Sequence, residues 1–132
     1  MSTLEIQTRD GKTRFRPGEE ITGTVAWTLD KSPNSVELRL FWYTRGKGIT
    51  DVGVVETLPF PAAGQSDRRD FHVPLPAKPF SFSGKLISLI WAIELIVQPG
   101  KQSSRFEFTL SPTGEEIVLQ PQSEPQPQLQ PS

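Results

Sequence analysis

Cysteine is absent from the 132-residue sequence, and histidine occurs once, as His72. Without cysteine the chain has no disulfide bond, no thiolate nucleophile and no sulfur-ligated metal, and it suits a reducing compartment. With a single histidine, a transition-metal site would have few ligands. His72 is also the only histidine that could act as the base for a serine nucleophile. These absences exclude several enzyme classes, and we expect a protein without metal or other cofactors.

An excess of charge of one sign is lacking as well, since 14 Lys and Arg residues are balanced by 15 Asp and Glu residues. No large basic field is available to hold a polyanion, so we expect no nucleic-acid partner. The most apolar run, residues 86–97, includes Glu94 and is shorter than the roughly 20 residues of a membrane-spanning helix. The first ten residues carry no import or secretion signal. We therefore expect a cytoplasmic protein that is not integral to a membrane.

Alternation of apolar and polar residues is the main pattern that is present. Between residues 20 and 29, apolar or small side chains occupy every second position, with threonines between them. This period of two is typical of a strand with one buried face. Pro17-Gly18 comes just before it and predicts a type II turn, because Pro fixes φ at the first corner and Gly accepts positive φ at the second. An earlier strand at 4–8 leads into Asp10-Gly11, a dipeptide that favours the tight turn of a hairpin.

The same alternation predicts further strands at 36–42, 52–58 (with a bulge at Gly53), 71–75, 87–97 and 106–110. About seven strands, without helix signals of comparable strength, predict an all-β fold, an antiparallel immunoglobulin-like β-sandwich. Residues 86–97 are apolar enough to fit a buried helix too. Their β-branched side chains, with Gly84 before them and Pro99-Gly100 after them, favour a strand.

The composition changes after Leu110. Five prolines and five glutamines fall between residues 111 and 132, with few apolar residues outside "EEIVL" at 115–119. We expect one sandwich domain over 1–119, in which "EEIVL" adds an edge strand, and a disordered Pro/Gln-rich tail over 120–132. The tail lacks the PxxP spacing that aromatic grooves recognise, which favours a spacer.

Catalytic motifs are weak. His72 is out of phase with the apolar residues of its strand, so its side chain should face solvent, and no G-x-S-x-G motif accompanies it. The glycines and lysine of "TRGKGIT", residues 44–50, lack the spacing of a phosphate-binding loop and favour a flexible hairpin loop.

Acidic and basic side chains near loops are most simply solvated surface charge. Asp51, Asp67 and Asp70 lack the spacing of a calcium loop, although a hydrolase built from carboxylates alone stays open as a third hypothesis. The neighbouring Arg68 and Arg69 also stay open as a phosphate contact.

Two strands carry apolar residues on the face away from the expected core. These residues are Phe41 and Tyr43 on one strand and Ile90 and Ile96 on the other. If the two strands are neighbours in one sheet, the four side chains form an exposed apolar patch rimmed by charge, which is typical of a partner-binding surface. The alternative is that the tail, a loop or "EEIVL" covers them.

Two segments of the sequence resemble the arrestin family. The first has an aromatic-x-Pro-Gly-Glu turn followed by an apolar-x-Gly-x-Val strand; its residues are Phe15, Pro17, Gly18, Glu19, Ile21, Gly23 and Val25. The second has proline-rich residues and an aromatic-Ser-x-Gly before a long strand; its residues are Pro79, Phe82, Gly84, Ile90 and Trp91. Together they frame about 100 residues in the order that the family shows.

The resemblance implies a seven-stranded immunoglobulin-like sandwich and a non-enzymatic role as adaptor, trafficking scaffold or regulator. Members of the family carry two such sandwiches in tandem, whereas this chain holds one. The first strand has no counterpart of the lysine pair of phosphate-sensing arrestins, and the tail has no proline-proline-x-tyrosine motif. Receptor binding, phosphate sensing and ubiquitin-ligase recruitment are therefore not implied.

We expect a protein-binding or scaffolding module that uses a sheet face or edge to join a protein partner, either another protein or a second copy as a homodimer. The alternative is a small-ligand or carbohydrate-binding sandwich that uses the loops at 46–51 and 65–69. Sugars stack on exposed aromatic rings, and no aromatic residue lies between Gly46 and Asp51. The protein-binding hypothesis is therefore preferred.

Overall fold

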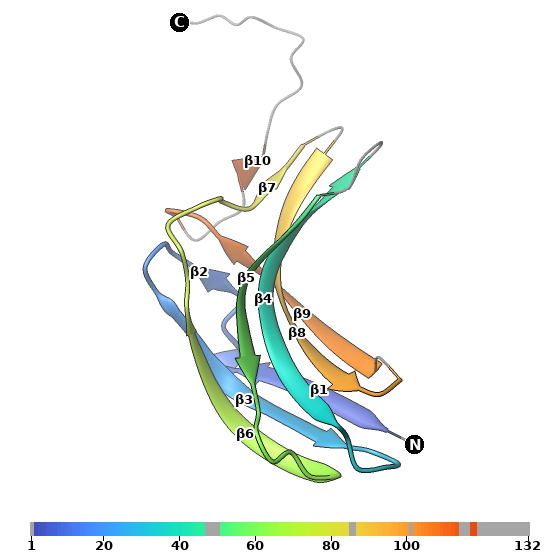
Figure 1. Cartoon of the computed structure of the whole chain (residues 1–132). Helices are drawn as coiled ribbons and strands as arrows, with labels where there is room; N and C mark the ends of the chain where they lie inside the picture. The colour runs from blue at the N-terminus through green and yellow to red at the C-terminus, as the bar shows by residue number, and fades with distance from the viewer. Residues whose placement is uncertain (1, 47–50, 85–86, 101, 114–116, 119–132) are drawn as a thin grey trace, which may run out of the picture.

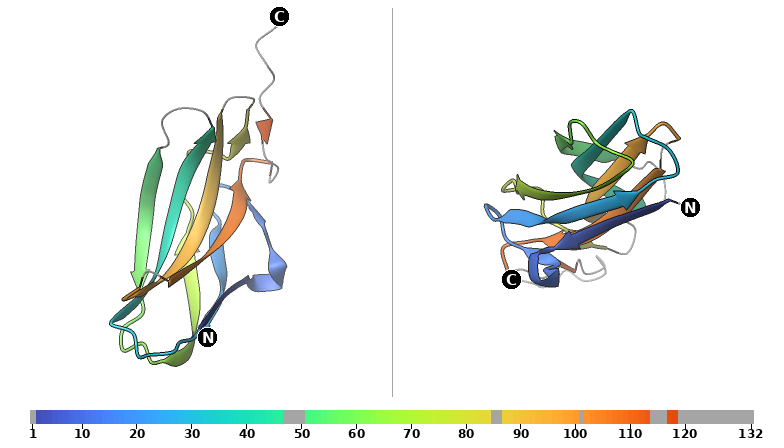
Figure 2. Two further views of the ribbon diagram at one scale, coloured as in Figure 1. Left: turned by 90° about the vertical axis from the view of Figure 1, so that its right-hand side faces the viewer. Right: turned by 90° about the horizontal axis from the view of Figure 1, so that it is seen from below.

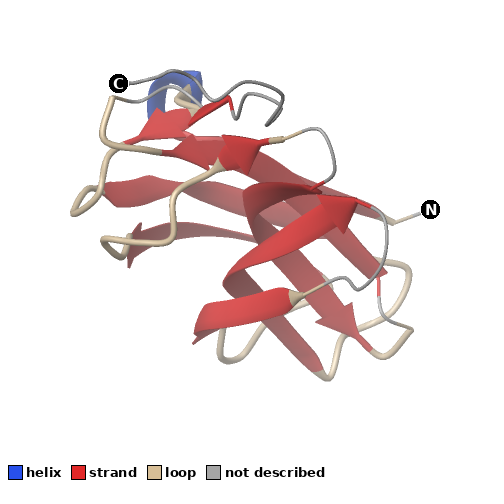
Figure 3. Cartoon of the chain, turned by 90° about the horizontal axis from the view of Figure 1, so that it is seen from above, coloured by secondary structure: helices blue, strands red, loops and turns tan. Residues whose placement is uncertain are grey.

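The predicted strands are present in the computed structural model, which describes residues 2–46, 51–84, 87–100, 102–113 and 117–118. Strands make up nearly all of its regular structure, with one short 3₁₀ turn at Arg9–Gly11 (Figure 3). The strands of six or more residues are β1 (Thr3–Thr8), β3 (Glu20–Thr28), β4 (Ser35–Gly46), β5 (Val52–Pro59), β6 (Ser66–Pro74), β8 (Ile87–Gln98) and β9 (Gln102–Leu110). The two-residue strands are β2 (Arg14–Phe15), β7 (Phe82–Ser83) and β10 (Ile117–Val118).

The strands form two packed sheets, as Figures 1 and 2 show. The smaller sheet has the order β1-β3-β6, and the larger has the order β10-β7-β8-β4-β5, with β9 on β8 and β2 on β9. Every ladder between two of the longer strands is antiparallel. The prediction of an all-β sandwich is confirmed, with the addition of two short parallel ladders, β2 with β9 and β7 with β10.

The core lies between the two sheets and is built from the alternating apolar rows. Ile21, Val25 and Trp27 of β3 are buried there. Gly23 belongs to the same row, and a Cβ at this position would collide with the backbone of Gln7 and Thr8 on β1. The glycine is therefore required for the close approach of β1 to β3.

The apolar run at 86–97 is the central strand β8 where the structure describes it, so the helix alternative is wrong. Alternate side chains of β8 point into the core; they are Leu89, Trp91, Ile93, Leu95 and Val97. Burial of apolar surface stabilises the fold by about 25 cal/mol per Å², so this row is a major source of stability.

The Pro17-Gly18 corner is the predicted turn. The Glu19 N–H donates to the Arg16 carbonyl oxygen over 3.1 Å, and Gly18 has a φ of 86°. The Glu19 carboxylate accepts the Arg16 N–H at 2.6 Å and pairs with Lys12 at 3.0 Å. The hydrogen bond from the Arg16 N–H, followed by the one from Lys12, lowers the pKa of Glu19.

The Asp10-Gly11 turn forms, but its hairpin does not. Both residues have positive φ, 58° and 66°, as a primed turn requires. However, β1 pairs with β3, and the chain after the turn joins the other sheet as β2. The Phe15 ring explains this crossing, because it is buried edge-on against Phe108 of β9, with ring centres 5.4 Å apart.

Two smaller predictions had different outcomes. The bulge in β5 is at Val55 and not at Gly53, because Leu40 pairs with Glu56 while the next residue, Phe41, pairs with Val54. The edge strand expected within 115–119 is present as β10, which pairs with β7.

The tail at 120–132 lies outside the described residues. Within the described parts of the chain, no helix is long and apolar enough to cross a membrane.

Candidate interaction surface

The strands that carry the predicted patch are neighbours in the larger sheet. β4 pairs with β8 along its whole length, and this register sets Tyr43 opposite Ile90 and Phe41 opposite Ala92. These side chains face away from the main core and form a second apolar cluster of Phe41, Tyr43, Ala92 and Ile90. The structure therefore brings three of the four predicted residues together on the outer face of the sheet.

Phe41 and Tyr43 are nevertheless buried, with 5% and 8% of their surface exposed, so the prediction that their side chains are exposed is wrong. Their rings stack on each other, with centres 6.0 Å apart. Arg105 of β9 covers both rings, since its guanidinium carbon lies 5.2 Å from the centre of Phe41 and 5.0 Å from that of Tyr43. An arginine in this position shields the aromatic surface from water through cation–π contact.

Ile96 lies apart from this cluster. Opposite residues along β4 and β8 place Ile96 beside Glu37, and the Arg39–Glu94 pair separates it from Phe41. Both Ile90 and Ile96 are half-buried. The predicted patch is thus divided by charged side chains, because the alternation that puts residues on one face says nothing about their order across strands.

Exposed apolar surface is found instead on the neighbouring strand β5. Val52, Val54 and Val55 expose 60%, 55% and 42% of their surface. Val52 pairs with Tyr43 and Val54 with Phe41, so both lie beside the aromatic rings. A hollow of about 330 Å³ joins these groups on the outer face; its lining consists of Arg39, Phe41, Tyr43, Val52, Val54, Glu94 and Arg105. The alternation at 52–58 predicts a strand there but not its place at the sheet edge, so the sequence does not indicate that these valines are exposed.

The rim of this outer-face hollow is charged, and several of its charges are paired. Arg105 approaches Glu94 at 3.8 Å, and Arg39 bonds to Glu37 at 2.6 Å. Beyond the hollow, the Tyr43 hydroxyl donates to the Glu107 carboxylate and accepts from Arg45 at 2.7 Å. An aromatic and aliphatic floor with a charged rim matches the anatomy of a protein–protein interface.

A larger hollow of about 610 Å³ lies on the outer face of the smaller sheet. It is lined mainly by polar residues; they include Thr22, Thr24, Asp70 and His72. His72 faces solvent as predicted, and its Nδ1 lies 3.3 Å from the Glu20 carboxylate. The hydroxyl of Thr24 donates to Asp70 at 3.2 Å. These groups pair with one another across β3 and β6, as is common on an exposed sheet face.

The carboxylates of the hydrolase hypothesis are not gathered into one site. Asp51 precedes β5 in the larger sheet, whereas Asp67 and Asp70 lie on β6 in the smaller sheet. The described residues contain no group of three or more His, Cys, Asp or Glu side chains that could hold a metal ion.

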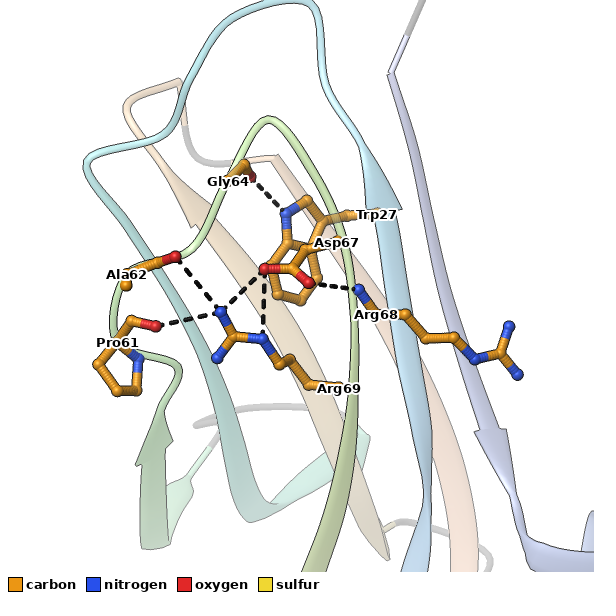
Figure 4. A network of polar contacts seen from close by, with 7 residues as sticks. All are labelled: Trp27, Pro61, Ala62, Gly64, Asp67, Arg68 and Arg69. Atoms are coloured by element: carbon orange, nitrogen blue, oxygen red, sulfur yellow. Dashed lines mark hydrogen bonds and ion pairs between the residues drawn. The ribbon is translucent and has the colours of Figure 1, made fainter.

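Asp67 belongs to a network that fixes the loop before β6 (Figure 4). It accepts from Arg69 at 2.8 Å and from the Arg68 N–H at 2.8 Å. Arg69 also donates to the carbonyl oxygens of Pro61, at 3.1 Å, and Ala62, at 3.3 Å. The bond from Arg69, and then the one from the Arg68 N–H, lowers the pKa of Asp67. The network engages Nε and Nη2 of Arg69, which makes this side chain a stabilising contact of the loop.

The loops of the carbohydrate hypothesis offer little to a ligand. Residues 47–50 lie outside the described residues. In the second loop, the Gln65 amide donates to the carbonyl oxygens of Leu29 and Asp30 at 2.9 and 3.1 Å, and Arg69 is held as described. These contacts give no support to a sugar-binding site in the loops.

Comparison with known proteins gives support at the level of the fold. The crystal structure of Spo0M, a sporulation control protein from Bacillus subtilis, superposes on 83% of this chain with a TM-score of 0.59 and 18% sequence identity. The chain has an arrestin-like fold. The arrestin-like chain spans about half of the neighbour, since the match covers 49% of that protein. No family model and no curated protein matches the sequence.

Proposed function

We propose that this arrestin-like chain is a non-enzymatic protein-binding module, a scaffold or adaptor that acts in the cytoplasm. Its binding surface is the outer-face hollow of the larger sheet. One observation carries the proposal: the stacked Phe41 and Tyr43 rings lie on the solvent side of the sheet, next to exposed valines of β5. Arg105 covers both rings, and Arg45 lies over Tyr43.

The chemistry of this surface supports a protein partner. Aromatic side chains and arginine are enriched in interfaces and supply most of their binding energy. Phe41, Tyr43 and Arg105 provide these types within one hollow, and Val52 and Val54 add apolar area that a partner can remove from water. Ile90, opposite Tyr43, packs against the aromatic cluster, while Ile96 lies apart from it.

The scattered acidic groups favour binding over catalysis. Asp67 and Asp70 are engaged by neighbouring side chains, and the one histidine is exposed and next to a carboxylate. An activated nucleophile needs a base within hydrogen-bond reach, held by a third group. The likeness to an arrestin-fold regulator points in the same direction.

Site-specific photo-cross-linking in the source cells tests the proposal. A photoreactive residue replaces Arg105 on the outer-face hollow in one variant and Arg68 on β6 in a matched variant. Both are exposed arginines on strands, in different sheets. We expect the Arg105 position to give one or a few specific protein adducts that the Arg68 position does not give. Equal adducts from both positions, or none from Arg105, would contradict the proposed surface.

A further inference from the structure

The strand β5 is a free edge of the larger sheet. The sheet order ends at β5, and the described residues pair it with β4 alone. An open edge presents unpaired backbone N–H and C=O groups and can accept a strand from another chain. Most edges are guarded against this by charged side chains, proline or bulges.

The features that prevent pairing at an edge are unevenly distributed over the edge strands of this molecule. The edge strand β6 of the smaller sheet carries four consecutive charged residues, 67–70. The second half of β5 has Glu56 and Pro59, and Pro lacks an N–H. The first half, residues 52–55, has no charged side chain and contains all three exposed valines. The bulge at Val55 marks the end of this unguarded half.

In residues 52–55, the backbone N–H and C=O groups of alternate residues point away from β4, toward the open edge. The Thr44 N–H donates to the Asp51 carbonyl oxygen at 2.9 Å, so the backbone of Asp51 faces β4. Successive residues of an antiparallel strand face opposite edges. The backbone groups of Val52 and Val54 therefore face the open edge, and those of Gly53 face β4.

We propose that a second copy of this chain pairs with it, β5 against β5, about a two-fold axis at Gly53. The antiparallel register sets Val52 of each copy opposite Val54 of the partner subunit. Residues directly opposite share a face of the sheet, and Val52 and Val54 both lie on the outer face, opposite Tyr43 and Phe41. The pairing forms about four backbone hydrogen bonds and one block of four valines.

A second copy fits this edge because residues 52–54 are self-complementary in the antiparallel register. Gly53 meets its own equivalent at the axis, where the narrow non-hydrogen-bonded spacing of about 4.5 Å suits a residue without a side chain. The nearest charge, Asp51, lies opposite Val55 of the partner subunit. The two Asp51 residues are four positions apart along the strands, about 13 Å, which exceeds the Debye length of about 8 Å in physiological salt. The same register places Glu56 of the partner subunit one position from the point opposite Asp51, so two Asp51–Glu56 pairs of like charge limit the affinity.

The size of the contact sets its strength. A pairing of a few residues buries less than the roughly 1,200 Å² of the smallest stable interfaces, so we expect a reversible dimer that dissociates on dilution. This inference goes beyond the proposed function, since it concerns the backbone edge of β5 and a second copy of the chain. Val52 and Val54 also line the outer-face hollow, so the test of the proposed function uses Arg105, which is not on the edge. Arg105 lies on β9, and β4 and β8 stand between it and β5.

Light scattering over a concentration series tests the dimer. We expect the mass of the intact chain to rise from 14.7 kDa at about 10 μM toward twice that value at about 1 mM. Val54→Lys should stay monomeric, since lysine guards an edge and Val54 is exposed enough to accept it without unfolding. Ser103→Lys, an exposed position on β9, is the matched control and should dimerise as the wild type does. A constant mass of 14.7 kDa, or equal dimerisation of Val54→Lys, would overturn the inference.

The register has its own test, because the chain has no cysteine. Val52→Cys protein is mixed with Val54→Cys protein and oxidised gently, and each is also oxidised alone. Opposite positions reach the Cα separation of about 5.5 Å that a disulfide needs. We expect the mixed disulfide to form at least several-fold faster than either symmetric one. Equal rates for all three would overturn the register. The Arg105 cross-links report on the proposed function whatever the outcome here.

Discussion

The guanidinium carbon of Arg105 on β9 lies 5.0 Å from the centre of the Tyr43 ring on β4, across the intervening strand β8. This relationship explains how an aromatic side chain is buried on a sheet face over which the described residues form no third layer. The arginine keeps its charge at the surface while its guanidinium covers the rings. A partner that displaces it gains access to an aromatic floor that is already in place.

Removal of this cover should weaken the fold slightly. We expect Arg105→Ala to lower the free energy of unfolding by about 0.5–1 kcal/mol, the usual range for an exposed cation–π contact. It should also increase the binding of an apolar fluorescent dye, because the rings become accessible. Chemical denaturation and dye titration measure the two effects, with Arg68→Ala as the control. An unchanged dye signal would mean that Arg105 does not shield the rings.

The Tyr43 hydroxyl should contribute through its bonds to Glu107 and Arg45. We expect Tyr43→Phe to cost about 1 kcal/mol of stability, the usual net value of one hydrogen bond. A double-mutant cycle with Glu107→Gln separates this bond from other effects of each substitution. A coupling energy near zero would show that the hydroxyl and the carboxylate act independently.

Gly53 should not tolerate a side chain. A Cβ at this position would collide with the indole ring of Trp42, whereas at Gly64 the nearest atom is 3.7 Å away. We expect Gly53→Ala to destabilise the fold by about 1–3 kcal/mol, as overpacking does. Gly64→Ala should change stability by less than about 0.5 kcal/mol. Thermal or chemical unfolding of the two variants measures this difference, and similar losses in both would contradict the assigned contact.

Asp67 should make stability depend on acid pH. Its pKa lies below the ordinary value of 3.8, chiefly because Arg69 bonds to it, so the folded state favours the charged form. The contribution is complete above pH 3.8 and is lost as the pH falls through the lower, folded-state pKa. We expect wild type to be more stable than Asp67→Asn at pH 6 and the difference to shrink toward pH 2. Melting temperatures across this range test the sign, and a difference that grows in acid would contradict it.

The period of two was sufficient to predict the layers of this fold. It located the seven longer strands and the rows that fill the core, because alternate positions of a strand face opposite sides whatever the pairing. The Pro17-Gly18 corner was also predictable, since positive φ at Gly18 is a local requirement. Which strands pair with each other is not determined by the local sequence. The crossing of the chain after Gly11 depends on the burial of Phe15 against Phe108, far away in the sequence.

The candidate surface was predictable only in part for the same reason. Facing directions placed Phe41, Tyr43 and Ile90 on the outer face, and the structure clusters them there. The covering arginine comes from β9, and alternation along a strand does not indicate which side chain of a neighbouring strand lies over the rings. The exposure of Val54 depends on β5 being an edge strand, and alternation is the same in edge and central strands.

Binding affinity for the protein that cross-links at position 105 tests the proposed surface most directly. The measurement compares wild type with Arg105→Glu on the outer-face hollow and with Arg68→Glu on the other sheet, two identical charge reversals at exposed arginines. We expect Arg105→Glu to weaken binding by at least tenfold, about 1.4 kcal/mol, and Arg68→Glu to leave it within about twofold. Equal affinities for wild type and Arg105→Glu would contradict the assignment of the outer-face hollow as the binding surface.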